Sequence, residues 1–155
     1  MRLEASVYIC RSPQDVWAYL GDVSNVAAWD RGVSRTLPSP STPPGVGFEF
    51  DTYAHPRPNS PDGTWGKMSY RITEIDPVRG CAIQLISTTG NARYFKSAEW
   101  RFRVVAEQEG SRVFCAAVFQ LKRRFLVLAP IFLAMKKAIR IDLEQLKAKM
   151  ESVAS

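Results

Sequence analysis

Helical patterns at both ends of the chain, with only strand and turn patterns between them, constrain the fold most. Ser12 and Pro13 begin an amphipathic helix, because Ser12 can cap its N-terminus and Pro13 suits the first helical position. Apolar residues recur at helical spacing near the end of the sequence, at Leu128, Phe132, Met135, Ile139, Leu143, Leu146 and Met150. This order predicts an antiparallel sheet that curls around one long final helix and encloses a pocket.

The middle of the chain alternates apolar and polar residues, as half-buried strands do. A second short helix is expected over 24–29, a proline-rich loop over 38–44, and a bulge at Ile75, where the alternation breaks. The expected strands are 2–10, a segment near Val33, 46–53, a segment around Met68 to Ile72, one with Ile83 and Leu85, 94–105 and 113–121, with a polar loop at 55–63 and turns at 76–80, 90–91 and 109–111. With 155 residues, the chain suits a single domain over 1–155.

Several stretches resemble a known superfamily. They are Val7-Tyr8-Ile9, the run from Arg11 to Leu20, Asp22, Trp29-Asp30, Gly32-Val33, the hairpin from Glu109 to Val113, and Asp142 to Lys147 with Glu151. Together they look like the START-related SRPBCC superfamily, and most like its polyketide cyclase/dehydrase and lipid-transport branch. The resemblance implies an α+β helix-grip fold: a curved antiparallel sheet of about seven strands, two short helices after the first strand, and a long C-terminal helix across the concave face. Members include lipid carriers and polyketide cyclases, so the fold leaves the activity open.

Aromatic side chains on the expected elements are candidates for the walls of the pocket, because ligand cavities are mostly apolar. The predicted ligand-binding residues are Trp29, Phe50, Tyr70, Trp100, Phe102, Phe119, Phe132 and Met135. Each of the strand aromatics is about as well suited to ordinary core packing. Glu99 and Arg101 alternate with Trp100 and Phe102 along the expected strand. If the two aromatic side chains point inward, Glu99 and Arg101 point outward and form a pair on the surface.

Three polar residues near one predicted strand end are candidates for catalysis: Asp51, Tyr53 and His55. An aspartate beside an apolar wall would have a raised pKa and could move protons in enolisation and dehydration. The leading hypothesis is a protein that binds a hydrophobic small molecule such as a lipid, polyketide or isoprenoid. The alternative is a cofactor-independent polyketide-type cyclase or dehydratase, in which the same residues do acid-base work rather than anchor a ligand hydroxyl.

Positive charge is concentrated near the end of the chain. From Lys122 onward there are eight basic and three acidic residues, in a protein of net charge +6. Segment 122–140 also contains an apolar run, 125–135, that is too short for a bilayer, which needs about twenty residues. Its outward apolar residues could line the pocket entrance, form a homodimer contact or touch a membrane surface, and the basic face could equally be a solvated helix side. Nucleic acid is not an expected partner, because no aromatic residues alternate with the charges.

Other chemistry has little support in the sequence. Cys10, Cys81 and Cys115 are far apart and in no paired spacing, so neither a disulfide framework nor a metal site is expected. No phosphate-binding loop, zinc-protease motif or serine elbow is found, and no cofactor is predicted. No secretory leader pattern begins the sequence, so a cytoplasmic location is expected, as a monomer or a homodimer.

Overall fold

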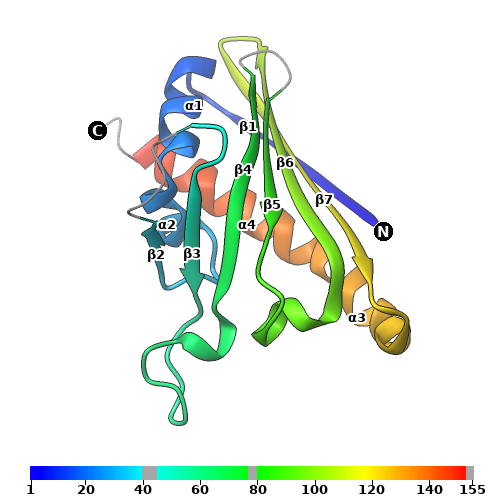
Figure 1. Ribbon diagram of the computed structural model, residues 1–155. Helices are drawn as coiled ribbons and strands as arrows, with labels where there is room; N and C mark the ends of the chain where they lie inside the picture. Colours follow the sequence, from blue (N-terminus) through cyan, green and yellow to red (C-terminus); the bar gives the residue numbers. More distant parts are fainter. Residues whose placement is uncertain (40–44, 77–79, 153–155) are drawn as a thin grey trace.

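The computed structural model describes residues 1–39, 45–76 and 80–152. Seven strands, four α-helices and four short 3-10 helices (η) follow one another along this part of the chain (Figure 1). In order they are β1 (Arg2–Ile9), α1 (Pro13–Gly21), η1 (Val23–Asn25), α2 (Val26–Trp29), β2 (Arg35–Pro38), β3 (Glu49–Tyr53), η2 (Thr64–Gly66), β4 (Met68–Asp76), β5 (Gly80–Leu85), η3 (Gly90–Tyr94), β6 (Phe95–Glu107), β7 (Gly110–Leu121), η4 (Arg123–Leu128), α3 (Ala129–Leu133) and α4 (Met135–Ser152).

The strands form one antiparallel sheet in the order β1-β7-β6-β5-β4-β3-β2. Segment α1–α2 carries the chain from β1 at one edge to β2 at the other, and α4 crosses one face of the sheet (Figure 1). The predicted α+β helix-grip arrangement is confirmed, with seven strands, two short helices after the first strand and a C-terminal helix.

The start of α1 forms for the reason that its sequence predicts. Ser12 has extended backbone angles, and its Oγ accepts a hydrogen bond from the Asp15 amide at 3.1 Å. Pro13 occupies the first turn, where a missing N–H costs no hydrogen bond. The helix then buries Val16 against the sheet.

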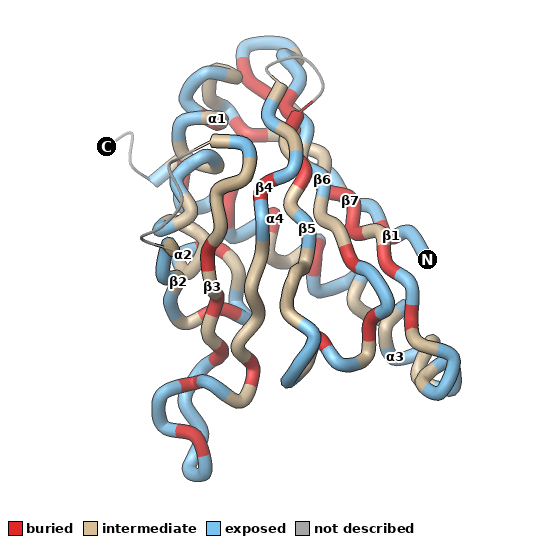
Figure 2. The backbone as a smooth tube through the Cα atoms, in the orientation of Figure 1, coloured by how far each residue is buried: buried red, intermediate tan, exposed pale blue. Residues whose placement is uncertain are grey.

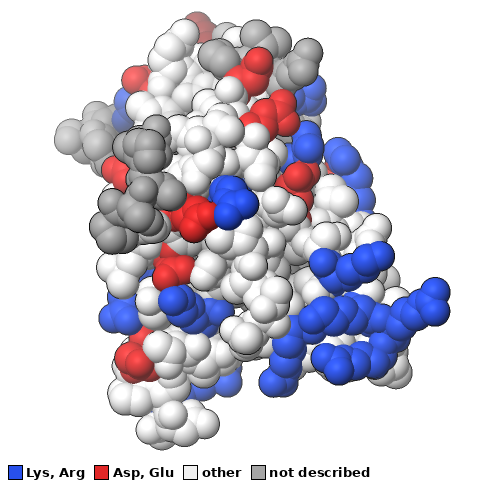
Figure 3. All heavy atoms as spheres, in the orientation of Figure 1, with Lys and Arg blue, Asp and Glu red and all other residues white. Residues whose placement is uncertain are grey.

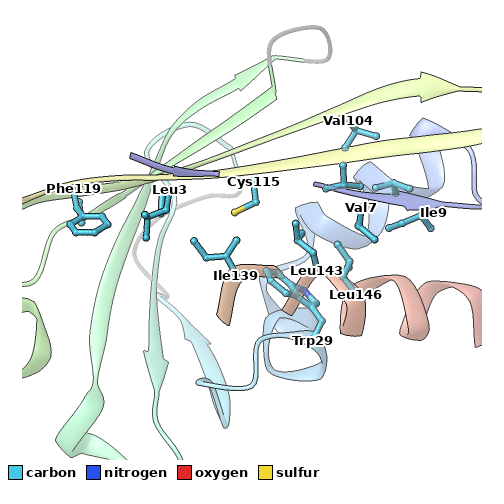
Figure 4. Packing of buried hydrophobic residues seen from close by; sticks show 14 of the residues in the cluster. Leu3, Val7, Ile9, Trp29, Val104, Cys115, Phe119, Ile139, Leu143 and Leu146 are labelled. Carbon is cyan, nitrogen blue, oxygen red and sulfur yellow. The ribbon is translucent and has the colours of Figure 1, made fainter. Parts of the chain in front are cut away.

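The main core lies between the sheet and α4 (Figures 2 and 4). Leu143 and Leu146 of α4 point toward Val7 and Ile9 of β1, and Trp29 of α2 closes the same layer from the side (Figure 4). Ile9 and Leu146 are fully buried. The helical spacing of the α4 residues and the alternation of β1 therefore meet in one apolar layer.

Several predicted boundaries need correction. The final helix begins at Met135 rather than at Leu128, because the helical run is interrupted at Ala134. Pro130 lies in the first turn of a separate short helix, α3, where its missing N–H costs no hydrogen bond. Strand β3 begins at Glu49 rather than at Val46, since Gly45 and Gly47 adopt positive φ in the preceding turn. The expected bulge is confirmed close to Ile75, between Ile72 and Glu74. Most of the predicted loop 38–44 and turn 76–80 lies outside the described residues, at 40–44 and 77–79.

Candidate functional site

Strands β3, β4 and β6 direct a row of aromatic side chains toward the α4 side of the sheet. Phe50 stacks with Tyr70 at a centroid distance of 5.6 Å, and Tyr70 meets Trp100 edge to face at 5.4 Å. Trp29 of α2 meets Phe102 edge to face at 6.0 Å. We call these five rings the aromatic row. Trp29, Trp100 and Phe102 also pack against the main core, which fixes the row to the helix side.

Tyr70 lies in the middle of the aromatic row. Burial raises the pKa of its hydroxyl far above the usual value, and that hydroxyl lies 3.1 Å from the sulfur of Met68. Even so, Tyr70, Trp100 and Phe102 are only half-buried. Three of the five rings therefore keep part of their surface accessible.

Two of the predicted ligand-binding residues belong to a second aromatic cluster. Phe132 of α3 lies 5.2 Å from Phe95 and 5.9 Å from Phe119, centroid to centroid, and 6.0 Å from Tyr94. Phe119 is 4% exposed, and its ring packs as core. Met135 is half-buried against the main core. This cluster anchors α3 to the end of the sheet.

Asp51 and Tyr53 point to the other face of β3. Asp51 Oδ2 lies 2.8 Å from Lys67 Nζ, and its Oδ1 accepts a hydrogen bond from Ser69 Oγ at 2.6 Å. The Arg35 guanidinium sits 4.3 Å above the Tyr53 ring. Because side chains alternate along a strand, the inward position of Phe50 puts both residues outside, away from the aromatic row. Their catalytic role stays a prediction, and neither side chain faces the aromatic row.

His55 follows β3 and lies beside the loop after α2. Its Nε2 is 3.0 Å from the Arg31 carbonyl oxygen, and its own carbonyl accepts a hydrogen bond from Trp65 Nε1 at 2.9 Å. The ring is exposed, but its charge reaches Asp30 and acts to lower the pKa of that carboxyl. Of the three predicted catalytic residues, His55 is therefore the one near the two half-buried carboxylates described next.

Asp30 directly follows Trp29 at the end of α2. Its Oδ1 accepts a hydrogen bond from the Gly32 amide at 2.8 Å. The pKa of Asp30 is raised to about 6, mainly by burial and also by the nearby charge of Asp142, while the Gly32 hydrogen bond and the charge of His55 act to lower it. A carboxyl with such a pKa exchanges protons close to neutral pH, as acid-base catalysis requires.

Asp142 of α4 faces the same region. Burial raises its pKa, while the amide and the guanidinium of Arg31, at 3.3 and 3.7 Å from Oδ1, oppose that rise. Burial also raises the pKa of Cys115 on β7 to about 12, with added contributions from Asp30 and Asp142. Asp30 raises the pKa of Tyr70 as well. The two carboxylates thus act electrostatically on groups of the inner sheet face, and we call Asp30 and Asp142 the acidic pair.

Sequence reasoning missed the acidic pair as functional residues. A signal was present for each: Asp30 adjoins a predicted pocket aromatic, and Asp142 lies next to Leu143 on the buried stripe of the last helix. Glu99 and Arg101 behave as predicted and form an ion pair on the outer face.

Two grooves lie elsewhere on the sheet. One, of about 600 Å³, runs over the outer sides of β1, β6 and β7 and includes Arg2, Arg103 and Phe114. The other, of about 460 Å³, borders Asp51 and Lys67. Within residues 1–39, 45–76 and 80–152, no three histidine, cysteine or acidic side chains gather closely enough to hold a metal ion.

The comparisons with known proteins agree with this architecture. The family described as polyketide cyclase / dehydrase and lipid transport matches residues 1–151. Because the match spans nearly the whole chain, the protein belongs to that family, within the SRPBCC-type helix-grip proteins. A search of curated proteins gives no match.

Solved structures with the same fold include catalysts and proteins described only by their source. A Thermus thermophilus protein is similar over 100% of both chains, with 17% identity and a TM-score of 0.72. The Zhui aromatase/cyclase of a Streptomyces strain is 12% identical, with 100% of this chain and 96% of that chain covered and a TM-score of 0.72. The di-domain ARO/CYC BexL is 15% identical, with 100% of this chain and 48% of that chain covered and a TM-score of 0.75. At these identities, the likeness extends to the fold alone.

No helix in the described segments combines the length and the apolar character needed to pass through a membrane.

Proposed function

We propose that the protein binds a hydrophobic, ring-containing small molecule between the sheet and α4. The observation that carries this proposal is the half-buried ring of Tyr70, which contacts Phe50 on one side and Trp100 on the other. Flat apolar walls favour aromatic or polyene ligands through stacking and edge contacts. The acidic pair at the Trp29 end of the aromatic row would accept hydrogen bonds from ligand hydroxyl groups.

A neutral fluorescent probe, N-phenyl-naphthylamine, tests this binding site. Trp100→Ala removes an inward ring of β6, and Phe114→Ala removes an equally half-buried ring from the outer face of β7. We expect Trp100→Ala to weaken probe binding about tenfold and Phe114→Ala to leave it unchanged. Native mass spectrometry of the freshly purified protein should also show a retained small molecule. Equal probe affinities in both variants, with no retained molecule, would reject the site.

A second function, cyclisation or dehydration of a poly-β-carbonyl substrate, is favoured by the position of Asp30. As a carboxylate, Asp30 would take a proton from a carbon between two carbonyl groups. As a carboxylic acid, it would return that proton to a departing hydroxyl, which leaves as water while the C=C bond forms. Its pKa near 6 keeps both forms populated around pH 6. The aromatic row would hold the flexible substrate folded, which lowers the entropic part of the barrier.

Product analysis with a reactive poly-β-carbonyl compound separates the catalyst from the carrier. A catalyst changes the spontaneous product mixture, and Asp30→Asn should remove most of that change. Glu99→Gln is the matched control, because it makes the same carboxyl-to-amide replacement on the outer face of β6. An unchanged product mixture with the wild-type protein would leave the binding function alone standing. The cytoplasmic location stays a prediction within this proposal.

A further inference from the structure

The segment between β7 and α4 exposes an apolar surface that the fold does not cover. Leu126, Val127, Ile131 and Leu133 are 56%, 81%, 66% and 52% exposed. All four lie on η4 or α3, at one end of the molecule (Figure 1). We call these four residues the apolar tip. Single exposed apolar residues are common, but four within eight positions on two adjoining short helices are a concentration of the kind that contacts a partner.

The apolar tip is held in place from the inside. Phe125 meets Tyr94 edge to face at 5.0 Å, and Phe132 packs against Phe95 and Phe119. The backbone amide of Lys122 also donates a hydrogen bond to the Tyr94 carbonyl at 3.0 Å. These contacts hold one side of η4 and α3 against the end of the sheet. The apolar tip on the other side is therefore exposed on a segment that is fixed in place.

Basic residues surround the apolar tip. Arg123 and Arg124 precede it, Lys136 and Lys137 follow it, and all four are exposed. Arg93 and Lys96, on either side of the Tyr94–Phe95 anchor, add to the same end, and Figure 3 shows the Lys and Arg side chains gathered there. Among the described residues, no carboxylate lies within ion-pair distance of these six basic groups. Their charge is therefore available to a partner.

We propose that the apolar tip and its basic rim dock on an anionic lipid surface. An apolar patch flanked by cations matches a bilayer interface, where the apolar side chains enter the acyl boundary and the cations contact lipid phosphates. A second copy of the chain fits less well, because pairing two such ends brings the unneutralised basic residues together. This docking does not depend on the proposed ligand site, since it uses a different part of the molecule.

Vesicle co-sedimentation tests the docking. The full-length chain is mixed with vesicles of phosphatidylcholine alone and with vesicles containing phosphatidylglycerol, at low and high salt. The double variant Val127→Glu/Ile131→Glu places carboxylates in the apolar tip. Val46→Glu is the control for one carboxylate placed at an exposed apolar position elsewhere, because Val46 is 66% exposed and lies in the turn before β3. Thermal unfolding of each variant verifies that it is folded.

We expect the wild-type chain to sediment with the anionic vesicles and to be released by salt. The double variant should bind at least about tenfold more weakly, while Val46→Glu binds as the wild type does. Lys136→Glu/Lys137→Glu should also bind more weakly. The proposal is overturned if the wild type stays in solution with anionic vesicles at low salt, or if the double variant binds as well as the wild type. It is equally overturned if sedimentation velocity shows a dimer that the double variant dissociates, because the apolar tip would then be covered by a second copy.

Discussion

The backbone amide of Arg31 donates a hydrogen bond to Asp142 Oδ1 over 3.3 Å, although the two residues are 111 positions apart. This contact joins the loop after α2 to α4. It also keeps the carboxyl of Asp142 close to Asp30, whose position is fixed by Trp29 packing and by the Gly32 amide. The electrostatic coupling of the acidic pair therefore follows from a tertiary contact between the two helical parts of the fold.

Asp142→Asn should lower the pKa of Asp30. The substitution removes a neighbouring negative charge that disfavours ionisation of Asp30, while the larger effect of burial remains. The pKa should therefore fall below about 6 but stay above the usual 3.8. Titration of the Asp30 carboxyl carbon by NMR measures this change. An unchanged pKa would mean that Asp142 does not act on Asp30.

Asp30→Asn should change how stability depends on pH. The pKa of Asp30 is higher in the folded protein than the 3.8 of an ordinary aspartate, so between these values the folded state binds more protons than the unfolded state. Asp30 therefore contributes to the free energy of unfolding below pH 4, and this contribution is lost as the pH rises through about 6. The loss is at most about 3 kcal/mol. Asp30→Asn removes this loss.

Urea unfolding at pH 4 and pH 7.5 measures the effect. The free energy of unfolding should decline less between these pH values in Asp30→Asn than in the wild type. Glu99→Gln, on the outer face, provides the control for a general change of charge. Equal declines in the wild type and Asp30→Asn would contradict the raised pKa.

Gly80→Ala should strongly destabilise the protein. Gly80 has φ +112, and a Cβ atom there would lie 1.9 Å from the Phe102 carbonyl oxygen on the neighbouring strand. The strained backbone and the backbone clash should together cost about 3 kcal/mol or more. Gly21→Ala at the end of α1 is the contrast, because nothing lies within 4 Å of its Cβ position. That substitution should be neutral or stabilising by up to about 1 kcal/mol. Chemical denaturation distinguishes the two variants.

Leu146→Ala should cost about 2–5 kcal/mol of unfolding free energy, because it opens a cavity in a close-packed layer. Leu146 is fully buried and lies with Val7 and Trp29 in the core (Figure 4). Leu133→Ala is the same substitution at a side chain that is 52% exposed, and it should change the free energy by about 0.5 kcal/mol or less. Similar losses in both variants would show that α4 does not form the core surface described above.

Local patterns predicted the fold well because each acts over a few residues. The Ser12 cap, the alternation in β1 and β7 and the stripe on α4 all form as their spacing indicates. The exception is the interruption at Ala134, which divides the apolar stripe between α3 and α4. A repeat of apolar residues survives a helix break when both pieces pack on the same core.

The candidate site was harder to predict, because it depends on which face of a strand turns inward and on which distant residues meet. The alternation of side chains along a strand places Asp51 and its neighbour Phe50 on opposite faces, so the two could not both face the pocket. That incompatibility could be read from the sequence. The meeting of Asp30 with Asp142 could not, because it needs the end of α2 to reach α4. The aromatic row was found from residue type, whereas the acidic pair required the tertiary structure.

The pairing of the first strand with the last has a consequence for synthesis on the ribosome. Among the described strands, β1 pairs only with β7, from Arg2 opposite Val118 to Ile9 opposite Ser111, and one of its faces packs on α4. After its synthesis β1 therefore waits for about a hundred or more further residues before its partner strand emerges, which takes roughly 5–20 s at common elongation rates. During that interval the nascent chain presents an unpaired apolar strand, so chaperones that hold extended segments should matter more for this protein than for one assembled from neighbouring hairpins.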